Sequence, residues 1–140
     1  MEKALPLCWK HKVKLITNMG SANPQAAAQK CVEIARRHGL TGMKIACVTG
    51  DDLLPVINKY MDAEVWETHE PLSKLPGEIV SANAYMGVEG ILKALEQGAD
   101  VVITGRVADP AIFMAPAIHA FGWSLEDWDK LGKGTLMGHL

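Results

Sequence analysis

Short apolar runs alternate along the chain with segments in which apolar residues recur at helical spacing. Residues 12–19, 43–49 and 99–104 predict strands, since each run is rich in β-branched residues and stops at a glycine. The run 99–104 is almost continuously apolar, which is typical of a strand buried on both faces of a parallel sheet. Weaker strand signals occur at residues 62–67 and 78–81.

Helical segments follow most of these runs. A helix is predicted directly after the first strand, with Asn23 as its N-cap and Pro24 as its first residue. Gly39 predicts its end. Its buried stripe is expected to consist of Ala28, Cys31, Val32 and Ala35. A second helix is expected after residues 50–52, and its inward-facing residues are expected to be Leu53, Leu54, Ile57, Tyr60 and Met61.

Three more helices are predicted in the second half of the chain. The first runs from Ala84 to a stop at Gly98, and the second follows Asp109 and Pro110 to about residue 120, with Pro116 kinking or ending it. A capping box of Ser124 and Asp127 predicts a small last helix through Trp128 and Leu131.

This alternation predicts an α/β fold. We expect one domain over residues 1–140, with a doubly wound, mostly parallel sheet of four to five strands and helices on both faces. Ligands in such sheets bind beyond the carboxyl ends of the strands, so the functional residues are expected in the turns that follow the strands.

Composition narrows the possible partners. Of the 140 residues, 49% are hydrophobic and 21% are charged, and the net charge of −2 gives no basic stripe for nucleic acid or an anionic membrane. No apolar run approaches a membrane span, and the N-terminus lacks the apolar core of a signal peptide, which favours the cytoplasm. Cys8, Cys31 and Cys47 are interpreted as reduced thiols, the last two in the core.

The sequence lacks the motifs of several common ligand-binding and catalytic sites. The chain contains no GxGxxG, GxxxxGK[ST], GxSxG, HExxH or paired CxxC, which argues against dinucleotide, P-loop, α/β-hydrolase and zinc sites. No metal site is predicted, and the cofactor stays open.

The turn residues carry the candidate chemistry. Arg106, just past the buried strand, is placed to grip a carboxylate or phosphate, although an ion pair with Asp109 or Asp52 is the alternative. Asp51 and Asp52 are candidate general acids or bases, and one of the two carboxylates could instead hold Mg²⁺, although helix capping is the alternative for both. Tyr85 is a candidate hydrogen-bond donor to an oxyanion, or a packed aromatic side chain.

The other turn residues are predicted to bind the substrate. They place small or polar groups where free backbone N–H groups favour an anion, and the alternative for Asn23 and Asp109 is simple capping. His139 is included because it follows a flexible polar turn at residues 134–138. The predicted binding residues are Asn18, Gly20, Ser21, Asn23, Thr49, Asn83, Thr104, Gly105, Arg106, Asp109 and His139.

The turns also resemble a known family. ITNMGSANP, VTGDDLLP, VSANAYMG, DVVITGRVADP and FGWSLEDWDKLGKGTLMGHL, in this order, resemble the acyclic terpene utilisation (AtuA-type) family over nearly the whole chain. The resemblance implies a role in bacterial catabolism of branched compounds such as citronellol and geraniol, through acyl-CoA intermediates, and no settled reaction. Members usually extend further on both sides, so this chain is expected to be an internal portion of the N-terminal α/β domain.

Two functions of different classes are considered. The first is an enzyme, or part of one, that binds a carboxylate or acyl-CoA and transfers a proton in the manner of a hydratase, lyase or isomerase. The second is a non-catalytic module that binds a small anion or another subunit. A homo-oligomer or a companion subunit is expected in either case, because Trp66, Trp123 and Trp128 would be exposed on an incomplete domain.

Overall fold

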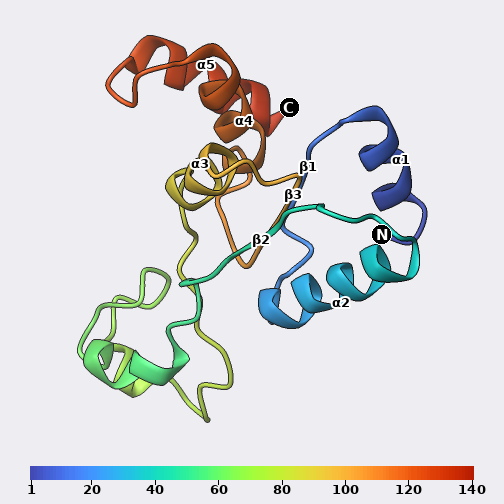
Figure 1. Ribbon diagram of the computed structural model, residues 1–140. Coiled ribbons are helices and arrows are strands. Elements are labelled where there is room, and N and C mark those ends of the chain that lie inside the picture. Colours follow the sequence, from blue (N-terminus) through green and yellow to red (C-terminus); the bar gives the residue numbers. More distant parts are fainter.

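A computed structural model describes residues 1–140 and contains one sheet of three parallel strands (Figure 1). The strands are β1 (Leu15–Thr17), β2 (Ile45–Val48) and β3 (Val101–Thr104), in the order β1-β3-β2. In the register, Val102 of β3 lies between Ile16 and Ala46. All four residues of β3 are buried, as its continuous apolar run predicts.

The sheet has three strands, where four to five were predicted. Residues 62–67 and 78–81 form no strand, and the only pairing there is an isolated bridge between Glu64 and Pro71. Both segments lie in a part of the chain that extends away from the sheet (Figure 1), so no sheet edge is beside them to pair with.

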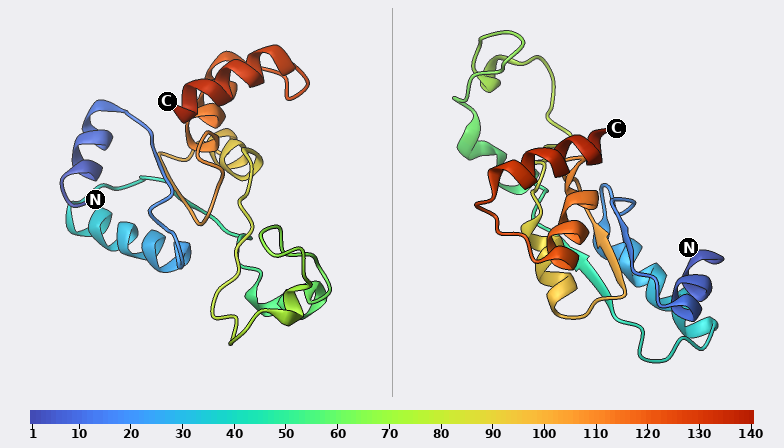
Figure 2. Two further views of the ribbon diagram at one scale, coloured as in Figure 1. Left: turned by 180° about the vertical axis from the view of Figure 1, so that it is seen from behind. Right: turned by 90° about the horizontal axis from the view of Figure 1, so that it is seen from above.

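Two helices cover one face of the sheet (Figure 2). They are α1 (Ala4–His11) and α2 (Pro24–Arg37), and their buried residues Leu5, Ala28, Cys31 and Ile34 pack against Val101 and Ile103. The predicted start of α2 is confirmed, because Asn23 Oδ1 accepts a hydrogen bond from Ala26 N at 3.0 Å. No pattern predicted α1, whose single fully packed residue, Leu5, gives no periodic signal.

The opposite face is covered by α3 (Glu89–Glu96) and α4 (Ala111–Phe121). Ile91 and Leu95 of α3 and Ala115 of α4 share a core with Val102, the strand residue that points away from α2. The helix α5 (Trp128–His139) packs on the outside of α4. Helices therefore lie on both faces of the sheet, as predicted.

Helix α3 begins five residues later than predicted. Residues 84–86 are extended instead, because Met86 pairs with Val107 in the turn after β3: Met86 N donates to Arg106 O at 3.2 Å and Ala108 N donates to Met86 O at 2.9 Å. The apolar residues at helical spacing begin at Ala84, but residues 84–86 are not helical, because Met86 pairs with the turn after β3. The spacing therefore predicted the start of this helix too early.

The last helix is longer than predicted. Asp127 is its N-cap and accepts from Lys130 N at 3.3 Å, while Ser124 Oγ accepts from Glu126 N, so the capping box is wrong. Residues 134–138 are helical, so the flexible turn predicted there is wrong as well. Gly138 lies so close to Pro110 that a Cβ would stand 2.8 Å from its Cα, so close packing explains this glycine.

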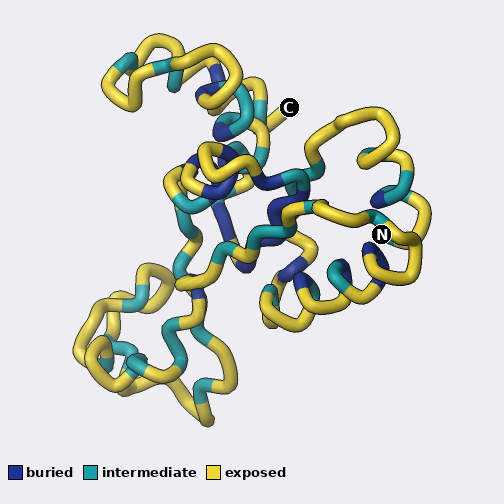
Figure 3. The backbone as a smooth tube through the Cα atoms, viewed as in Figure 1, coloured by how far each residue is buried: buried dark blue, intermediate teal, exposed yellow.

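Residues 53–80 form a lobe that projects from the sheet, which we call the 53–80 lobe (Figure 3). It contains two 3-10 helices, η1 (Leu54–Tyr60) and η2 (Leu72–Lys74), and no residue of the lobe is buried. The helix predicted after residue 52 is present only as a 3-10 helix, and the inward-facing apolar face predicted for it is wrong. Its apolar residues are at most half-buried, and packing supplies most of the stability of a short α-helix.

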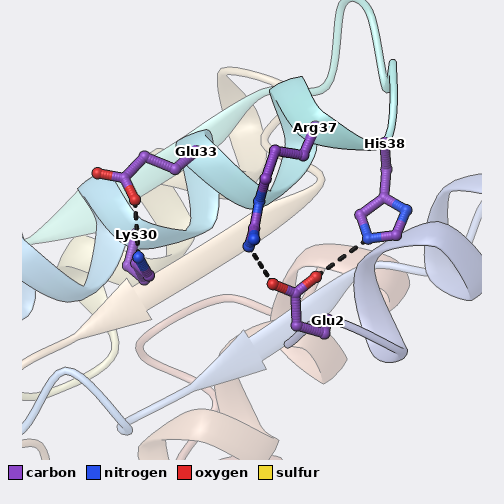
Figure 4. Close-up of polar contacts among 5 residues, drawn as sticks. All are labelled: Glu2, Lys30, Glu33, Arg37 and His38. Carbon is purple, nitrogen blue, oxygen red and sulfur yellow. Dashed lines mark hydrogen bonds and ion pairs between the residues drawn. The ribbon is translucent and has the colours of Figure 1, made fainter.

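Polar contacts tie the N-terminus to the end of α2 (Figure 4). Glu2 pairs with Arg37 and lies 3.0 Å from His38 Nε2, while Lys30 pairs with Glu33 at 2.9 Å. The hydrogen bond from His38, followed by the charge of Arg37, lowers the pKa of Glu2 below its ordinary value. The contacts of Glu2 link the residues just before α1 to the end of α2, whereas Lys30 and Glu33 both lie within α2.

The three cysteines are free thiols in different surroundings. Cys31 is buried in α2, as predicted, and burial raises the pKa of its thiol. Cys47 is exposed on the edge strand β2, so its placement in the core is wrong. None of the helices is long and apolar enough to cross a membrane.

Candidate functional site

The carboxyl ends of the three strands meet at one edge of the sheet, as parallel pairing requires. The turn after β1 is pressed against the end of β3. Gly20 is buried there, and a Cβ on it would overlap the carbonyl oxygen of Thr104 and stand 2.8 Å from Pro24. The turn is closed by Ser21 N, which donates to Asn18 O at 3.1 Å. Glycine is required at position 20 by this close approach.

Asp51, in the turn after β2, is almost completely buried, with 3% of its surface exposed. Its Oδ2 accepts hydrogen bonds from Arg106 N at 2.9 Å and from Asn83 Nδ2 at 3.1 Å. A Cβ on Gly105 would overlap this carboxylate, standing 2.6 Å from Oδ2. Asp51 therefore joins three segments that are far apart in the sequence, and Gly105 leaves room for it.

Asp52 makes different contacts from Asp51, although the two are adjacent. Its side chain is exposed, and Oδ1 accepts from Leu54 N at 3.0 Å, so it caps the local turn. The two carboxylates consequently serve separate hydrogen-bond networks. No group of three or more His, Cys, Asp or Glu side chains comes together in a way that could hold a metal ion.

Arg106 follows directly after this buried arrangement. Its guanidinium donates to the Tyr85 hydroxyl and lies 4.8 Å from the centre of the Tyr85 ring. It forms no ion pair with Asp109 or Asp52, the alternative considered from the sequence. Its positive charge is thus held beside an aromatic ring and left without a carboxylate partner.

A pocket of about 290 Å³, which we call the arginine pocket, opens beside this guanidinium. Most of its lining is polar, and it combines one cation, one carboxylate, two hydroxyl groups and one amide. The carboxylate, Asp109, was interpreted as a possible cap, but the helix α4 begins without a side-chain cap. The lining residues are Asn18, Ser21, Tyr85, Gly105, Arg106, Val107 and Asp109.

A second pocket of about 330 Å³ lies between the turns after β1 and β2, and its lining includes Asn23, Thr49, Asp51 and Asp52. Both pockets are thus formed by turns at the carboxyl ends of the strands. The structure divides most of the predicted binding residues between these two pockets.

The remaining predicted residues lie outside both pockets. Thr104 is fully buried, and its hydroxyl donates to Gly105 O at 2.9 Å, while Asn83 is engaged with Asp51. His139 lies exposed in the last turn of α5 and lines neither pocket. Sequence reasoning missed Val107, whose pairing with Met86 brings Tyr85 beside Arg106. Its only signal was an apolar residue within a polar turn.

Comparison with known proteins yields a family. The family model described as "Acyclic terpene utilisation family protein AtuA" matches residues 1–140, the whole chain. No curated protein and no solved structure matches the chain.

Proposed function

We propose that the arginine pocket binds the anionic or thioester end of a branched acyl substrate. The chain belongs to the acyclic terpene utilisation family AtuA, and this membership is the reason for expecting such a substrate. The observation that carries the proposal is the unpaired Arg106 guanidinium in a polar pocket at the carboxyl ends of the strands. Such substrates occur where coenzyme A thioesters are made and consumed, so the proposal places the chain in the cytoplasm.

The pocket suits a small polar head group. Its volume of about 290 Å³ is at the lower end of ligand sites and accommodates a carboxylate or thioester carbonyl with a few carbon atoms. Arg106 presents a planar donor pair to an oxyanion, and the hydroxyl groups of Ser21 and Tyr85 and the amide of Asn18 supply further donors.

We assign the proton-transfer step to Asp109. It is the only carboxylate that lines the arginine pocket, whereas Asp51 is committed to two hydrogen bonds and Asp52 lines the other pocket. A carboxylate beside a cation that polarises the substrate carbonyl is suited to remove a proton from the adjacent carbon. This chemistry belongs to the hydratase, lyase and isomerase classes.

The binding part of the proposal is tested by calorimetry with isovalerate and isovaleryl-CoA. Replacing Arg106 by Gln removes one or two charge-assisted hydrogen bonds, each contributing about 1.5 to 3 kcal/mol, so affinity should fall at least about tenfold. The control is Arg36→Gln, since Arg36 is exposed on α2 and lines neither pocket. Equal affinity for wild-type chain and Arg106→Gln would refute the proposal.

The catalytic part is tested by nuclear magnetic resonance in D₂O. The wild-type chain should exchange the protons next to the thioester carbonyl of isovaleryl-CoA for deuterium, and Asp109→Asn should bind the thioester but catalyse no exchange. Binding by the wild-type chain without exchange would favour the alternative, a non-catalytic anion-binding module. The open, polar arginine pocket is compatible with that alternative.

A further inference from the structure

The chain exposes more surface than a folded monomer of its size. Its accessible surface is 9343 Å², whereas a compact monomer of 15.2 kDa exposes about 7,100 Å². The excess is about 2,200 Å², and a standard interface covers about 800 Å² on each partner. The chain therefore carries enough surplus surface for two such contacts.

The 53–80 lobe contributes an acidic part of that surface. It contains five Asp and Glu residues and two Lys residues, so its net charge is −3. In the lobe, Trp66 is 84% exposed and stands in the sequence between Glu64 and Glu67. His69 contacts Glu64 Oε1 at 2.6 Å, and Val65 N donates to Glu70 O at 2.8 Å. The tryptophan is thus exposed on a negatively charged lobe whose neighbouring residues are joined by hydrogen bonds.

The N-terminal third of the chain has the opposite charge. Residues 1–44 contain eight Lys and Arg residues and two Glu residues, so their net charge is +6. A pocket of about 550 Å³ lies there, at the edge of the sheet where the strands begin. Most of its lining residues are apolar, including Trp9 and Met43, and its charged lining residues are Lys12, Lys14 and Asp100, so the net charge of the lining is +1. The Lys14 ammonium donates to Ala99 O at 2.6 Å, which leaves Lys12 as the cation that is free to meet an acidic partner.

The lobe projects beyond one edge of the sheet (Figure 1), and the residues that line this pocket lie at the opposite edge. The lobe follows the carboxyl end of β2, and the pocket lies beside the amino-terminal ends of β1 and β3. A chain consequently does not fill its own pocket with its own lobe. Two copies, however, can exchange lobes reciprocally, because each has one acidic lobe and one basic pocket.

We propose that this chain forms a two-fold dimer in which Trp66 of each copy occupies the basic pocket of the other. A buried tryptophan in a pocket is a common energetic centre of an interface. Glu67 beside Trp66 then faces Lys12 at the rim of the pocket, and such opposite charges steer association and fix the register. The reciprocal contacts account for the surplus surface of both copies.

The oligomeric state of the full 140-residue chain tests this proposal. Sedimentation equilibrium should show a dimer that dissociates as salt is raised, since salt screens the charges at the rim. Trp66→Ser should raise the dimer Kd at least about tenfold. The matched control is Trp128→Ser, because Trp128 is also exposed, at 76%, but lies on α5 outside the proposed interface.

A charge exchange identifies the partner surfaces. Glu67→Lys and Lys12→Glu should each weaken self-association, because both contacts of the homodimer then oppose like charges. Mixing the two variants should restore a heterodimer, because in that pair both contacts oppose unlike charges. Circular dichroism of each variant confirms that the fold is intact. The proposal is overturned if the wild-type chain is monomeric or if Trp66→Ser leaves the dimer Kd unchanged. It is also overturned if the Trp66 and Trp128 variants lose the same amount of dimer affinity, or if mixing the two charge variants restores no heterodimer.

Discussion

The turns at the carboxyl ends of the strands and the 53–80 lobe are both polar segments, but they are held in place differently. Asp51 and Gly20 lie buried among the strand ends, and their positions are fixed by packing as well as by hydrogen bonds. The lobe has no buried residue and keeps its shape through local hydrogen bonds such as Leu72 N to Ala63 O at 2.8 Å. Polarity in the sequence therefore does not distinguish turns that pack on the sheet from a protruding surface, whereas the burial of residues such as Asp51 and Gly20 does.

The largest expected difference is between the losses of unfolding free energy when an apolar side chain is shortened in the core under the sheet and in the lobe. Ile91 is fully buried beneath the sheet, and Ile91→Ala should lower the free energy of unfolding by about 3 kcal/mol through lost burial and a residual cavity. Val80→Ala in the lobe should change it by less than about 0.5 kcal/mol, because Val80 is exposed. Urea unfolding measures both variants. Equal effects would show that the lobe is packed in solution.

The second comparison removes one carboxylate from each region. Asp51→Ala leaves Arg106 N and Asn83 Nδ2 without their acceptor and should cost about 2 to 3 kcal/mol of unfolding free energy. Asp62→Ala in the lobe should cost less than about 0.5 kcal/mol, since Asp62 is exposed. Urea unfolding of the two variants would contradict this account if Asp51→Ala were as mild as Asp62→Ala.

A third difference concerns local opening of the chain. The lobe should be cut by trypsin before the rest of the chain, at Lys59 or Lys74, because a segment without a buried core opens at little cost. Lys93, in the helix α3 that packs on the sheet, should be protected. Mass spectrometry of the first fragments measures the order of cleavage. Because the proposed dimer should slow cleavage in the lobe, the order of cleavage is measured at concentrations below the dimer Kd. First cuts at Lys93 under these conditions would contradict the comparison.

The sequence predicted the elements whose signals are local. The strand β3 is a continuous apolar run, and the start of α2 has an N-cap followed by proline, so neither depends on distant residues. Residues 84–86 were wrongly predicted as helix, and the α-helix with a buried face predicted over residues 53–61 is a 3-10 helix with no buried residue, because both conformations depend on the partner surface. Met86 pairs with Val107, whereas Ile57 is only half-buried.

The residues of the candidate site were likewise predictable where the signal is local or set by the topology, and not where it depends on packing. Parallel topology alone placed the turns after the strands at one edge, which is why Arg106, Asn18 and Ser21 could be expected together. The buried contacts of Asp51 could not be predicted, because they depend on the space that Gly105 leaves for its carboxylate. The contact of Asp52 is a local cap, which was one of the alternatives that the sequence offered. The position of His139 depends on the packing of α5 against α4, which no motif encodes.

The smallest expected effect lies at the N-terminus, where a surface contact joins two helices without burial. Because the pKa of Glu2 is lowered from 4.5 in the folded chain, its contribution to stability is present above pH 4.5 and is lost as the pH falls through the folded pKa. Glu2→Gln should therefore slightly reduce the melting temperature at pH 7 and leave it unchanged at pH 2. The control is Glu96→Gln, since Glu96 forms no ion pair. A loss of the same size at both pH values would mean that Glu2 acts through packing rather than through its charge.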